Sequence, residues 1–498
     1  MNKLNLKLIL YIIGLLLVFN GMSMLICSFV SLILDDGVTN ELLISASVPI
    51  IIGIILMLFN KNNIRQINKR DGYIIVTLGW LTMVISGMLP YHLTNSIIGA
   101  PNLFFETMSG YTTTGSTILE DVEQLPKSII FWRSMTHWLG GMGIIVLAIA
   151  ILPLLGIGGM QLFSAEAPGV SGDKIHPRIS DTAKRLWVIY VGLTVLETVL
   201  LNIAGMSFFD AINNSMSNIA SGGFSSKNDS IAYWNDVPII QYIIVVFMFL
   251  AGTNFILIYF GLTGKIKKIY KNTEFKWYLS LIVFFVLIVS TVLYYSIDLN
   301  ETGVNHPQVY GKLESSFRHA LFQVVAIVTT TGFVTGDFIA WGSFLTMFFF
   351  AIMFLGGSSG STSGGVKVLR HLILIKNGLL EFKRSLHPNA IIPLRHNNSV
   401  VEKPVVIHVL AFFILYLILF IVGAGVLSLM GLDFISAIGG AASSIGNVGP
   451  ALGDLGPTNT FVSLPDLGKY WCAFLMLVGR LELFTVLILF TPYFWRDR

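Results

Sequence analysis

The chain has 498 residues, of which 54% are hydrophobic and only 12% are charged, and its formal net charge is +4. A soluble globular domain carries about 25% charged residues, so this composition excludes a water-soluble protein of this size. Apolar runs recur from end to end, which excludes a separate soluble catalytic or nucleotide-binding domain. The two cysteines, Cys27 and Cys472, both lie inside apolar runs, which excludes a disulfide framework and a cysteine-based metal site. The sequence therefore predicts an integral membrane protein.

A helix needs about 20 mainly apolar residues to cross a membrane. Segments of this kind occur near 8–34, 42–59, 73–91, 129–154, 187–207, 238–262, 277–297, 342–356, 404–430 and 470–494. The first run is too long for the apolar core of a signal peptide, so we expect a retained helix. The eighth runs into the Gly/Ser stretch 356–365 and resumes at Val366. This pattern predicts a helix broken at membrane depth, where protein or a water-filled cavity must surround the freed backbone.

Lysine and arginine gather in four of the linkers, at residues 61–70, 174–185, 265–276 and 367–395. Cytoplasmic loops of membrane proteins carry an excess of these cations. We therefore expect these linkers and both termini in the cytoplasm. The number of crossings agrees with that orientation only if each outward linker after the second helix enters the membrane and returns without crossing.

Each of those outward linkers contains a semi-apolar stretch of about 10–15 residues, too short to span, followed by a Thr/Ser/Gly cluster. The clusters are Thr112–Thr117, Ile219–Phe224, Thr329–Val334 and Gly446–Ala451. The glycines at 115, 222, 332 and 449 are 107, 110 and 117 residues apart. This spacing predicts a fourfold internal repeat of helix, re-entrant loop and helix.

The residue types of these clusters favour cation binding. A potassium ion in a narrow pore must replace its water shell with oxygens, which rings of backbone carbonyls supply. Successive carbonyls point the same way only in backbone conformations that glycine tolerates. The short helix before each cluster would also aim its partly negative C-terminal end at the pore axis. One Thr-Thr-Thr-Gly alone is typical of a loop turn, but four in equivalent places predict a cation site at mid-depth.

With these motifs the chain resembles the Trk/Ktr/HKT superfamily of potassium transporters and, within it, the Trk-type pore subunit. Besides the four loops, the resemblance includes His137–Ile144, Ile151–Leu162, Pro177–Ala183, Gly356–Thr362, His387–Pro388 and Gly479–Glu482. It covers essentially the whole chain. The two extra spans before residue 60 are similar to the Trk branch rather than to the shorter Ktr pore subunit.

The resemblance implies an all-α polytopic membrane protein with four pseudo-symmetric helix–pore loop–helix repeats around a central ion pathway, preceded by two extra transmembrane helices. The two helices would occupy 1–70 and the repeats 71–175, 176–270, 271–395 and 396–498. It also implies potassium uptake rather than an enzymatic activity, in the cytoplasmic (inner) membrane. The expected partners are a second copy in a homodimer and a cytosolic nucleotide-binding regulatory ring of the TrkA type, with no nucleic acid and no cofactor besides the transported K⁺.

The resemblance also implies roles for individual residues. Potassium-binding filter positions are Thr113, Thr114, Gly115, Ala220, Ser221, Gly222, Thr330, Thr331, Gly332, Asn447, Val448 and Gly449. A gating role falls on the loop made of Gly356, Gly357, Ser358, Ser359, Gly360, Ser361, Thr362, Ser363, Gly364 and Gly365. The alternative for that loop is a close-packed kink between helices.

Arg480 is a second candidate gate, close to the middle of the last predicted span. An arginine at the bilayer centre costs about 2.5–3.5 kcal/mol, so its side chain must face protein or water. Glu482 lies about 200° around the same predicted helix. We therefore expect Arg480 to point into the pore and Glu482 to find another partner, such as Lys367. The alternative is a purely structural ion pair within the bundle.

Enzyme motifs are weak. Gly356–Gly360 matches the Gly-x-Ser-x-Gly elbow of serine hydrolases, but the histidines near the spans lie toward their ends, where none can serve as the base. The nine histidines lack metal-ligand spacing, and His137 is expected to be a packing or capping residue. Val366 stands where a phosphate-binding loop requires lysine.

Carboxylates near the outward mouth would raise the local cation concentration. They are Glu106, Glu120, Asp121, Asp229, Asp337 and Asp454.

The alternative function is a sodium- or proton-coupled symporter. Symporters often show inverted two-part repeats, whereas these four loops share one orientation, which favours a conduction pathway.

Overall fold

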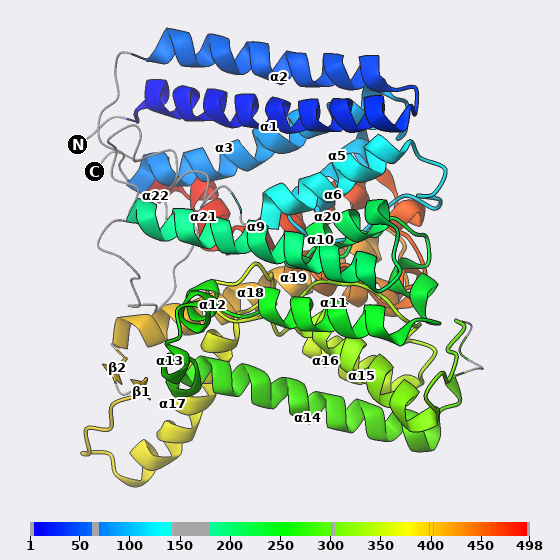
Figure 1. The fold of residues 1–498 in the computed structure, drawn as a ribbon. Helices are drawn as coiled ribbons and strands as arrows, with labels where there is room; N and C mark the ends of the chain where they lie inside the picture. Colours follow the sequence, from blue (N-terminus) through cyan, green and yellow to red (C-terminus); the bar gives the residue numbers. More distant parts are fainter. Residues whose placement is uncertain are drawn as a thin grey trace.

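The computed structural model describes residues 4–61, 69–141, 143, 179–299, 302, 304–397, 399–401 and 403–495. In these residues the chain is almost entirely α-helical (Figure 1). The strands of the described chain are the short antiparallel pair β1 (Arg395–His396) and β2 (Ser399–Val400). The predicted all-α class is confirmed.

The first half of the chain contains α1 (Leu6–Leu34), α2 (Thr39–Asn60), α3 (Lys69–Gly87), α4 (Leu89–Leu93), α5 (Ala100–Tyr111), α6 (Lys127–Gly141), α9 (Ile179–Ile203), α10 (Phe208–Ile219), α11 (Pro238–Ala251) and α12 (Phe255–Leu262). The second half contains α13 (Ile266–Lys271), α14 (Thr273–Ser296), α15 (Lys312–Val328), α16 (Ser343–Ile352), α17 (Val368–Leu386), α18 (Lys403–Leu429), α19 (Phe434–Gly446), α20 (Asp466–Arg480), α21 (Phe484–Leu487) and α22 (Pro492–Trp495). Six helices of the described chain are long and apolar enough to cross a membrane, or up to eight spans if each bent pair counts as one.

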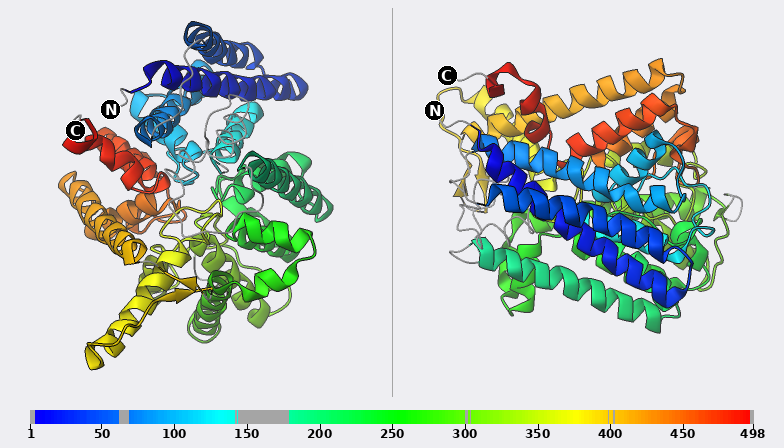
Figure 2. Two further views of the ribbon diagram at one scale, coloured as in Figure 1. Left: turned by 90° about the vertical axis from the view of Figure 1, so that its left-hand side faces the viewer. Right: turned by 90° about the horizontal axis from the view of Figure 1, so that it is seen from above.

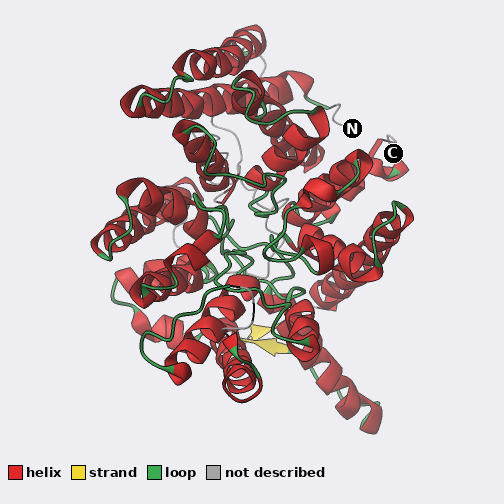
Figure 3. Cartoon of the chain, turned by 90° about the vertical axis from the view of Figure 1, so that its right-hand side faces the viewer, coloured by secondary structure: helices red, strands yellow, loops and turns green. Residues whose placement is uncertain are grey.

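One sequence of elements occurs four times. A long helix (α3, α9, α14 or α18) is followed by a short helix (α5, α10, α15 or α19), a loop, and a second helix (α6, α11, α16 or α20). Figure 3 shows these helices around a central zone of loops. The loops that end the short helices therefore meet in the middle of the molecule, as the repeat predicted.

The two N-terminal helices lie outside this ring of helices (Figure 1). They pack closely because glycines face each other: a Cβ on Gly14 would lie 2.7 Å from the carbonyl oxygen of Gly53. α1 also contacts the first repeat, since the Asn20 amide donates to Ser86 Oγ (2.8 Å) and the Tyr111 hydroxyl donates to Asn20 Oδ1 (2.6 Å).

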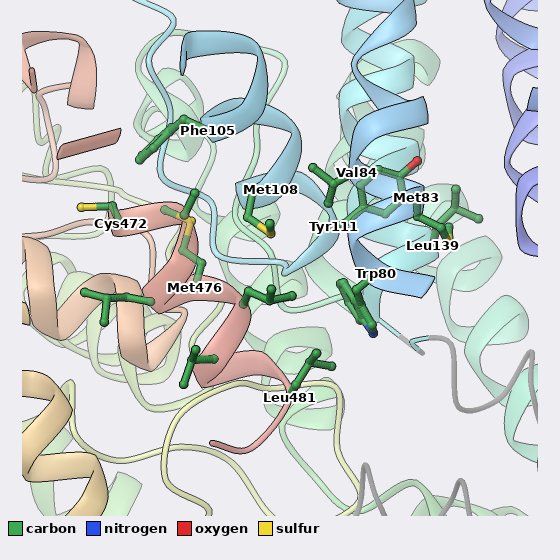
Figure 4. Close-up of a cluster of buried hydrophobic side chains, with 14 of the residues drawn as sticks. Trp80, Met83, Val84, Phe105, Met108, Tyr111, Leu139, Cys472, Met476 and Leu481 are labelled. Carbon is green, nitrogen blue, oxygen red and sulfur yellow. The ribbon is translucent and has the colours of Figure 1, made fainter. Parts of the chain in front are cut away.

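A buried apolar cluster joins the first repeat to the fourth, which lies beside it. Val84 of α3, Tyr111 of α5 and Met476 of α20 belong to it, and Figure 4 shows that these segments, distant in sequence, lie side by side. The core thus surrounds the central loops rather than filling one domain.

Three of the helices that follow a ring loop, α11, α16 and α20, are broken, whereas the sequence predicted a break only after α16. The Gly/Ser loop separates α16 from α17, as expected. The predicted spans 238–262 and 470–494 are also interrupted: α11 and α12 meet at 108°, and α20 and the segment Phe484–Phe490 meet at 109°. At the first of these bends Asn254 caps α12 by accepting from Ile256 N (2.8 Å). The first bend contains Thr253 and Asn254 and the second contains Arg480 and Glu482, but the flanking segments are so apolar that each bent pair still has the mean hydropathy of one span.

Part of the first repeat lies outside the described residues. These are 142 and 144–178, which include most of the second half of the predicted span 129–154, the motif Ile151–Leu162, and the basic residues Lys174 and Arg178.

Both ends of the chain lie at the same end of the molecule (Figure 2). α13 and α17, which carry most of the cations of two of the basic clusters, lie at that end as well (Figure 1). For these two basic linkers and the termini, this agrees with the expectation of one shared side of the membrane.

Candidate ion pathway

The loops that follow the four short helices share one backbone pattern. Each has a non-glycine residue in the left-handed region, with φ between 50° and 57°: Thr113, Ser221, Thr330 and Asn447. Two residues later each has a glycine with φ between 75° and 103°: Gly115, Gly223, Gly332 and Gly449. A side chain at a φ of that kind is strained, so glycine is needed there.

This pattern corrects the predicted register of the second loop. The counterpart of Gly115 is Gly223, not Gly222, because Gly222 does not have a positive φ. Ser221-Gly222-Gly223 therefore matches Thr113-Thr114-Gly115, and Ala220 takes the place of a helix-capping residue. Two adjacent glycines fit either register in the sequence, and only the backbone conformation separates them.

The four loops close into a ring. A Cβ built on Gly115 would overlap the carbonyl oxygen of Gly222 in the second loop. The same overlap links Gly223 to Thr331, Gly332 to Val448, and Gly449 to Thr114. Each loop thus touches the next, and the fourth returns to the first. The carbonyls of Thr114, Gly222, Thr331 and Val448, which we call the carbonyl ring, lie around one centre, and none of them accepts a hydrogen bond from the described residues.

Side-chain hydrogen bonds hold the loops in place. The hydroxyls of Thr112 and Thr114 lie 2.8 Å apart, and those of Thr329 and Thr331 repeat that contact at 2.8 Å. The fourth loop is tied to the first, because Asn447 Nδ2 donates to Thr114 Oγ1 at 2.9 Å. These bonds leave the backbone carbonyls of the ring free for another ligand.

The Gly/Ser loop 356–365, which we call the intramembrane loop, is bonded to the broken helix beside it. Ser358 N donates to the carbonyl of Gly252 (2.8 Å), and Phe255 N donates to the carbonyl of Gly360 (3.1 Å). The backbone groups freed by one helix break therefore satisfy those freed by the other, as a break at membrane depth requires.

The intramembrane loop also forms hydrogen bonds with two of the four ring loops. Thr362 Oγ1 lies 2.9 Å from Ser221 Oγ and donates to the carbonyl of Ile219 at 2.9 Å. Gly364 N donates to Thr330 Oγ1 at 2.6 Å. The loop therefore packs directly against the second and third ring loops.

Arg480 ends α20 and ties the intramembrane loop to α6. Its Nη1 donates to the carbonyl of Thr362 (2.8 Å), and its Nη2 donates to the carbonyls of Gly140 (2.8 Å) and Gly141 (3.1 Å). An arginine fork can reach two separate carbonyl groups in this way, whereas a lysine ammonium is a point charge.

The predicted surroundings of Arg480 need two corrections. Glu482 does not lie on the same helix, because α20 ends at Arg480 and Glu482 has a φ of 58°. Its ionic partner is Arg370 rather than Lys367. Lys367 instead donates to the carbonyl of Ser363, within the intramembrane loop.

Glu106 is buried and does not line the outward mouth, contrary to the expectation. It forms an ion pair with Arg133 (2.7 Å) and accepts from Ile118 N (3.0 Å). Arg133 also lies over the ring of Phe224, 3.5 Å from its centroid, so the pair braces the first and second loops. Sequence reasoning missed Arg133, whose only signal was a cation inside an apolar helix.

The remaining mouth carboxylates are exposed or half-buried: Glu120, Asp121, Asp229, Asp337 and Asp454. A hydrogen bond from Asn228 (2.9 Å) holds the pKa of Asp121 below its usual range, so this carboxylate stays ionised near the outer surface.

His137 is a packing residue, as expected: it bonds Ser217 Oγ (2.8 Å) and stacks on Phe224. The described residues contain no cluster of three metal-ligating side chains.

Comparisons with known proteins agree on one family. The family model described as TrkH, cation transport protein, matches residues 41–496. The chain is 39% identical over 493 residues to the Trk system potassium uptake protein TrkH of Salmonella typhimurium, covering 98% of both chains. It is 34% identical over 435 residues to TrkG of Escherichia coli, covering 87% of each. The crystal structure of the potassium transporter TrkH from Vibrio parahaemolyticus superposes with a TM-score of 0.86 at 37% identity, covering 99% of this chain and 100% of that one.

The corrected register can be tested by a paired substitution. A Cβ on Gly222 would overlap the imidazole of His137, whereas a Cβ on Gly223 would overlap the main-chain carbonyl of Thr331. Gly222→Ala should therefore destabilise the protein by about 1–3 kcal/mol through overpacking, and should cost little in a His137→Ala background. Gly223→Ala should destabilise the protein equally in the wild-type and the His137→Ala backgrounds. Thermal unfolding of the purified variants measures this, and equal rescue of both glycine variants would refute the register.

Proposed function

Because the chain belongs to the TrkH family of cation transport proteins, we propose that it takes up potassium through the carbonyl ring. The family comprises transporters and not enzymes. The observation that carries the proposal is the cyclic closure of four loops, which leaves four carbonyl oxygens around one centre without protein donors among the described residues. Relatives named as potassium uptake proteins support potassium as the ion.

The energetics favour a weakly hydrated cation at this position. Carbonyl oxygens replace water ligands without carrying a full countercharge, so an ion can bind and still leave. Each short helix ends directly before the ring, and a helix C-terminus carries a partial charge of about −0.5. Four such ends attract a cation and repel an anion.

The proposed potassium-facing residues are those of the four ring loops in the corrected register. They are Thr113, Thr114, Gly115, Ser221, Gly222, Gly223, Thr330, Thr331, Gly332, Asn447, Val448 and Gly449. Gly223 enters this set in place of Ala220.

The intramembrane loop and Arg480 are proposed to close the pathway beside the ring. Their mutual hydrogen bond joins the third and fourth repeats, and Arg480 extends that contact to α6 of the first. The loop consists of small residues, so it obstructs the path without filling it permanently. Its bonds to Ser221 and Thr330 mean that opening must alter contacts of the ring itself.

The proposed partners are a second copy of the chain and a cytosolic nucleotide-binding regulatory ring, at the cytoplasmic membrane of a bacterium. An exposed apolar stripe supports the first: Ile375, Leu379, Phe382 and Leu386 lie on one face of α17. Exposed cations such as Lys383 at the same end of the molecule support contact with a soluble partner.

Ion flux into vesicles that contain the purified protein tests the function. We expect Rb⁺ uptake, used as a tracer for K⁺, to exceed Na⁺ uptake and to proceed without an imposed proton or sodium gradient. Gly223→Ser should abolish this preference, because a side chain there displaces the Thr331 carbonyl. Gly205→Ser is the matched control, since Gly205 has a φ of 106° but no atoms near its missing Cβ. Uptake that requires a proton or sodium gradient would favour the coupled symporter instead.

Arg480→Ala should raise Rb⁺ flux in the absence of any regulatory partner, with the Rb⁺ over Na⁺ preference nearly intact. The intramembrane loop loses its bond to the guanidinium, so we expect an increase of about tenfold, the factor for one charge-assisted hydrogen bond. Arg480→Lys keeps the charge but not the forked guanidinium, so its Rb⁺ flux should lie between that of the wild type and that of Arg480→Ala. A lower flux in well-folded Arg480→Ala protein would show that Arg480 serves conduction or structure rather than closure.

A further inference from the structure

An acidic side chain lies inside a membrane-spanning helix behind the second ring loop. Glu197 of α9 is fully buried, six residues before the helix ends at Ile203. Its Oε1 accepts a hydrogen bond of 2.5 Å from Nδ2 of Asn218, near the end of α10. Its Oε2 has no partner among the described residues. A buried carboxyl group in a membrane span is costly, which makes it a candidate for a function.

The side-chain amide of Asn218 also has one atom without a hydrogen-bond partner among the described residues. Its Nδ2 also donates to the carbonyl of Ile244 in α11 (3.1 Å), so both amide hydrogens are used. Its Oδ1 is buried and has no partner among the described residues. One proton on Glu197 Oε2 would supply a donor to Asn218 Oδ1 and close an acid–amide pair with two hydrogen bonds. An ionised carboxylate would instead leave two buried acceptor oxygens without donors.

The surroundings favour the neutral acid. The helices packed against α9 are α6, α10, α11 and α12 (Figure 1). Ionisable groups on the described parts of these helices and of α9, Glu197 aside, are engaged elsewhere or exposed: Lys127, Arg133, His137, Lys184, Arg185, Tyr190, Asp210, Tyr242 and Tyr259. None of them contributes to the electrostatics of Glu197. An ionised carboxylate would also face the partly negative C-terminal end of α10.

Asn218 connects this pair to the ring. Its backbone carbonyl accepts from Ser221 N (2.8 Å), and the preceding carbonyl, of Ser217, accepts from Gly222 N (2.9 Å). Ser221 has the positive φ of the ring loops, and Gly222 provides a ring carbonyl. The last turn of α10 is therefore held by Glu197 on its outer side and holds the second ring loop on its inner side.

We propose that Glu197 and Asn218 form a proton-binding site that positions the second ring loop. The proton resides on Glu197 Oε2 at neutral pH and completes the acid–amide pair. As the pH rises it is released to water, the second hydrogen bond is lost, and the last turn of α10 loosens. Glu197 is a positioning residue, and its effect on ion preference rests on the proposed function of the ring.

The test compares Rb⁺ and Na⁺ uptake by the purified full chain in vesicles at neutral and alkaline pH. Glu197→Gln keeps both hydrogen bonds and cannot ionise, so its Rb⁺/Na⁺ ratio should match the wild type at neutral pH. The wild-type ratio should fall about fivefold at alkaline pH, the factor for one lost hydrogen bond, and the Glu197→Gln ratio should not. Glu197→Leu should have the low ratio at both pH values. Thr198→Val, which removes a buried hydroxyl bonded only within α9, should behave as the wild type.

Two outcomes would overturn the proposal. One is a Glu197→Gln ratio at neutral pH as low as that of Glu197→Leu, which would mean that an ionised carboxylate is required. The other is a wild-type ratio that falls no more at alkaline pH than that of Glu197→Gln. If Glu197→Gln does not fold, Asn218→Ala replaces it, because its ratio should be independent of pH, and the wild-type pH dependence in this variant would refute the link.

A second readout separates this proposal from the function on which it rests. The thermal unfolding temperature of the wild type should drop at alkaline pH relative to Glu197→Gln, whether or not the ring conducts. An equal drop in the unfolding temperatures of the wild type and Glu197→Gln would overturn the proposed proton-binding site. Absence of Rb⁺ uptake by the wild type, with the difference in unfolding temperature present, would refute only the proposed function.

Discussion

Backbone groups freed within a membrane must find partners inside the protein, and the centre of this molecule depends on that constraint. The break between α11 and α12 is satisfied by the intramembrane loop between α16 and α17, through Ser358 N and the carbonyl of Gly360. The carbonyls at the end of α6 are satisfied by Arg480, from the break that ends α20. Backbone groups freed by a helix break in one repeat are thus hydrogen-bonded by groups from a break in another repeat. The carbonyl ring is the exception, because its oxygens accept no hydrogen bond from the described residues.

Contacts of the intramembrane loop connect the carbonyl ring to Arg480. Thr362 contacts Ser221 of the second ring loop with its hydroxyl and Arg480 with its carbonyl, so one residue touches both the ring and the candidate gate. On the opposite side of that ring loop, Asn218 connects α10 to Glu197. The second ring loop is therefore held from two sides, by the intramembrane loop and by the last turn of α10.

The sequence was sufficient for the all-α class, the four loops and the break at 356–365, because each leaves a pattern of composition or spacing. It was insufficient where the deciding quantity is a backbone angle or a distant partner. Gly222 and Gly223 are indistinguishable by composition, and only φ assigns the ring position. The bends after Ala251 and Arg480 are marked by only a few polar residues within predicted spans that are otherwise apolar. Glu106 was misplaced at the mouth because its partner, Arg133, is on another helix, and the one signal of the buried Glu197 was an acidic residue inside an apolar span.

The central claim is that a monovalent cation binds within the carbonyl ring. Anomalous diffraction from crystals grown with Rb⁺ in place of K⁺ tests it most directly. We predict an anomalous peak on the axis of the four repeats, in direct contact with the carbonyl oxygens of Thr114, Gly222, Thr331 and Val448. A well-ordered ring without a peak, or a peak coordinated by other residues, would contradict the account.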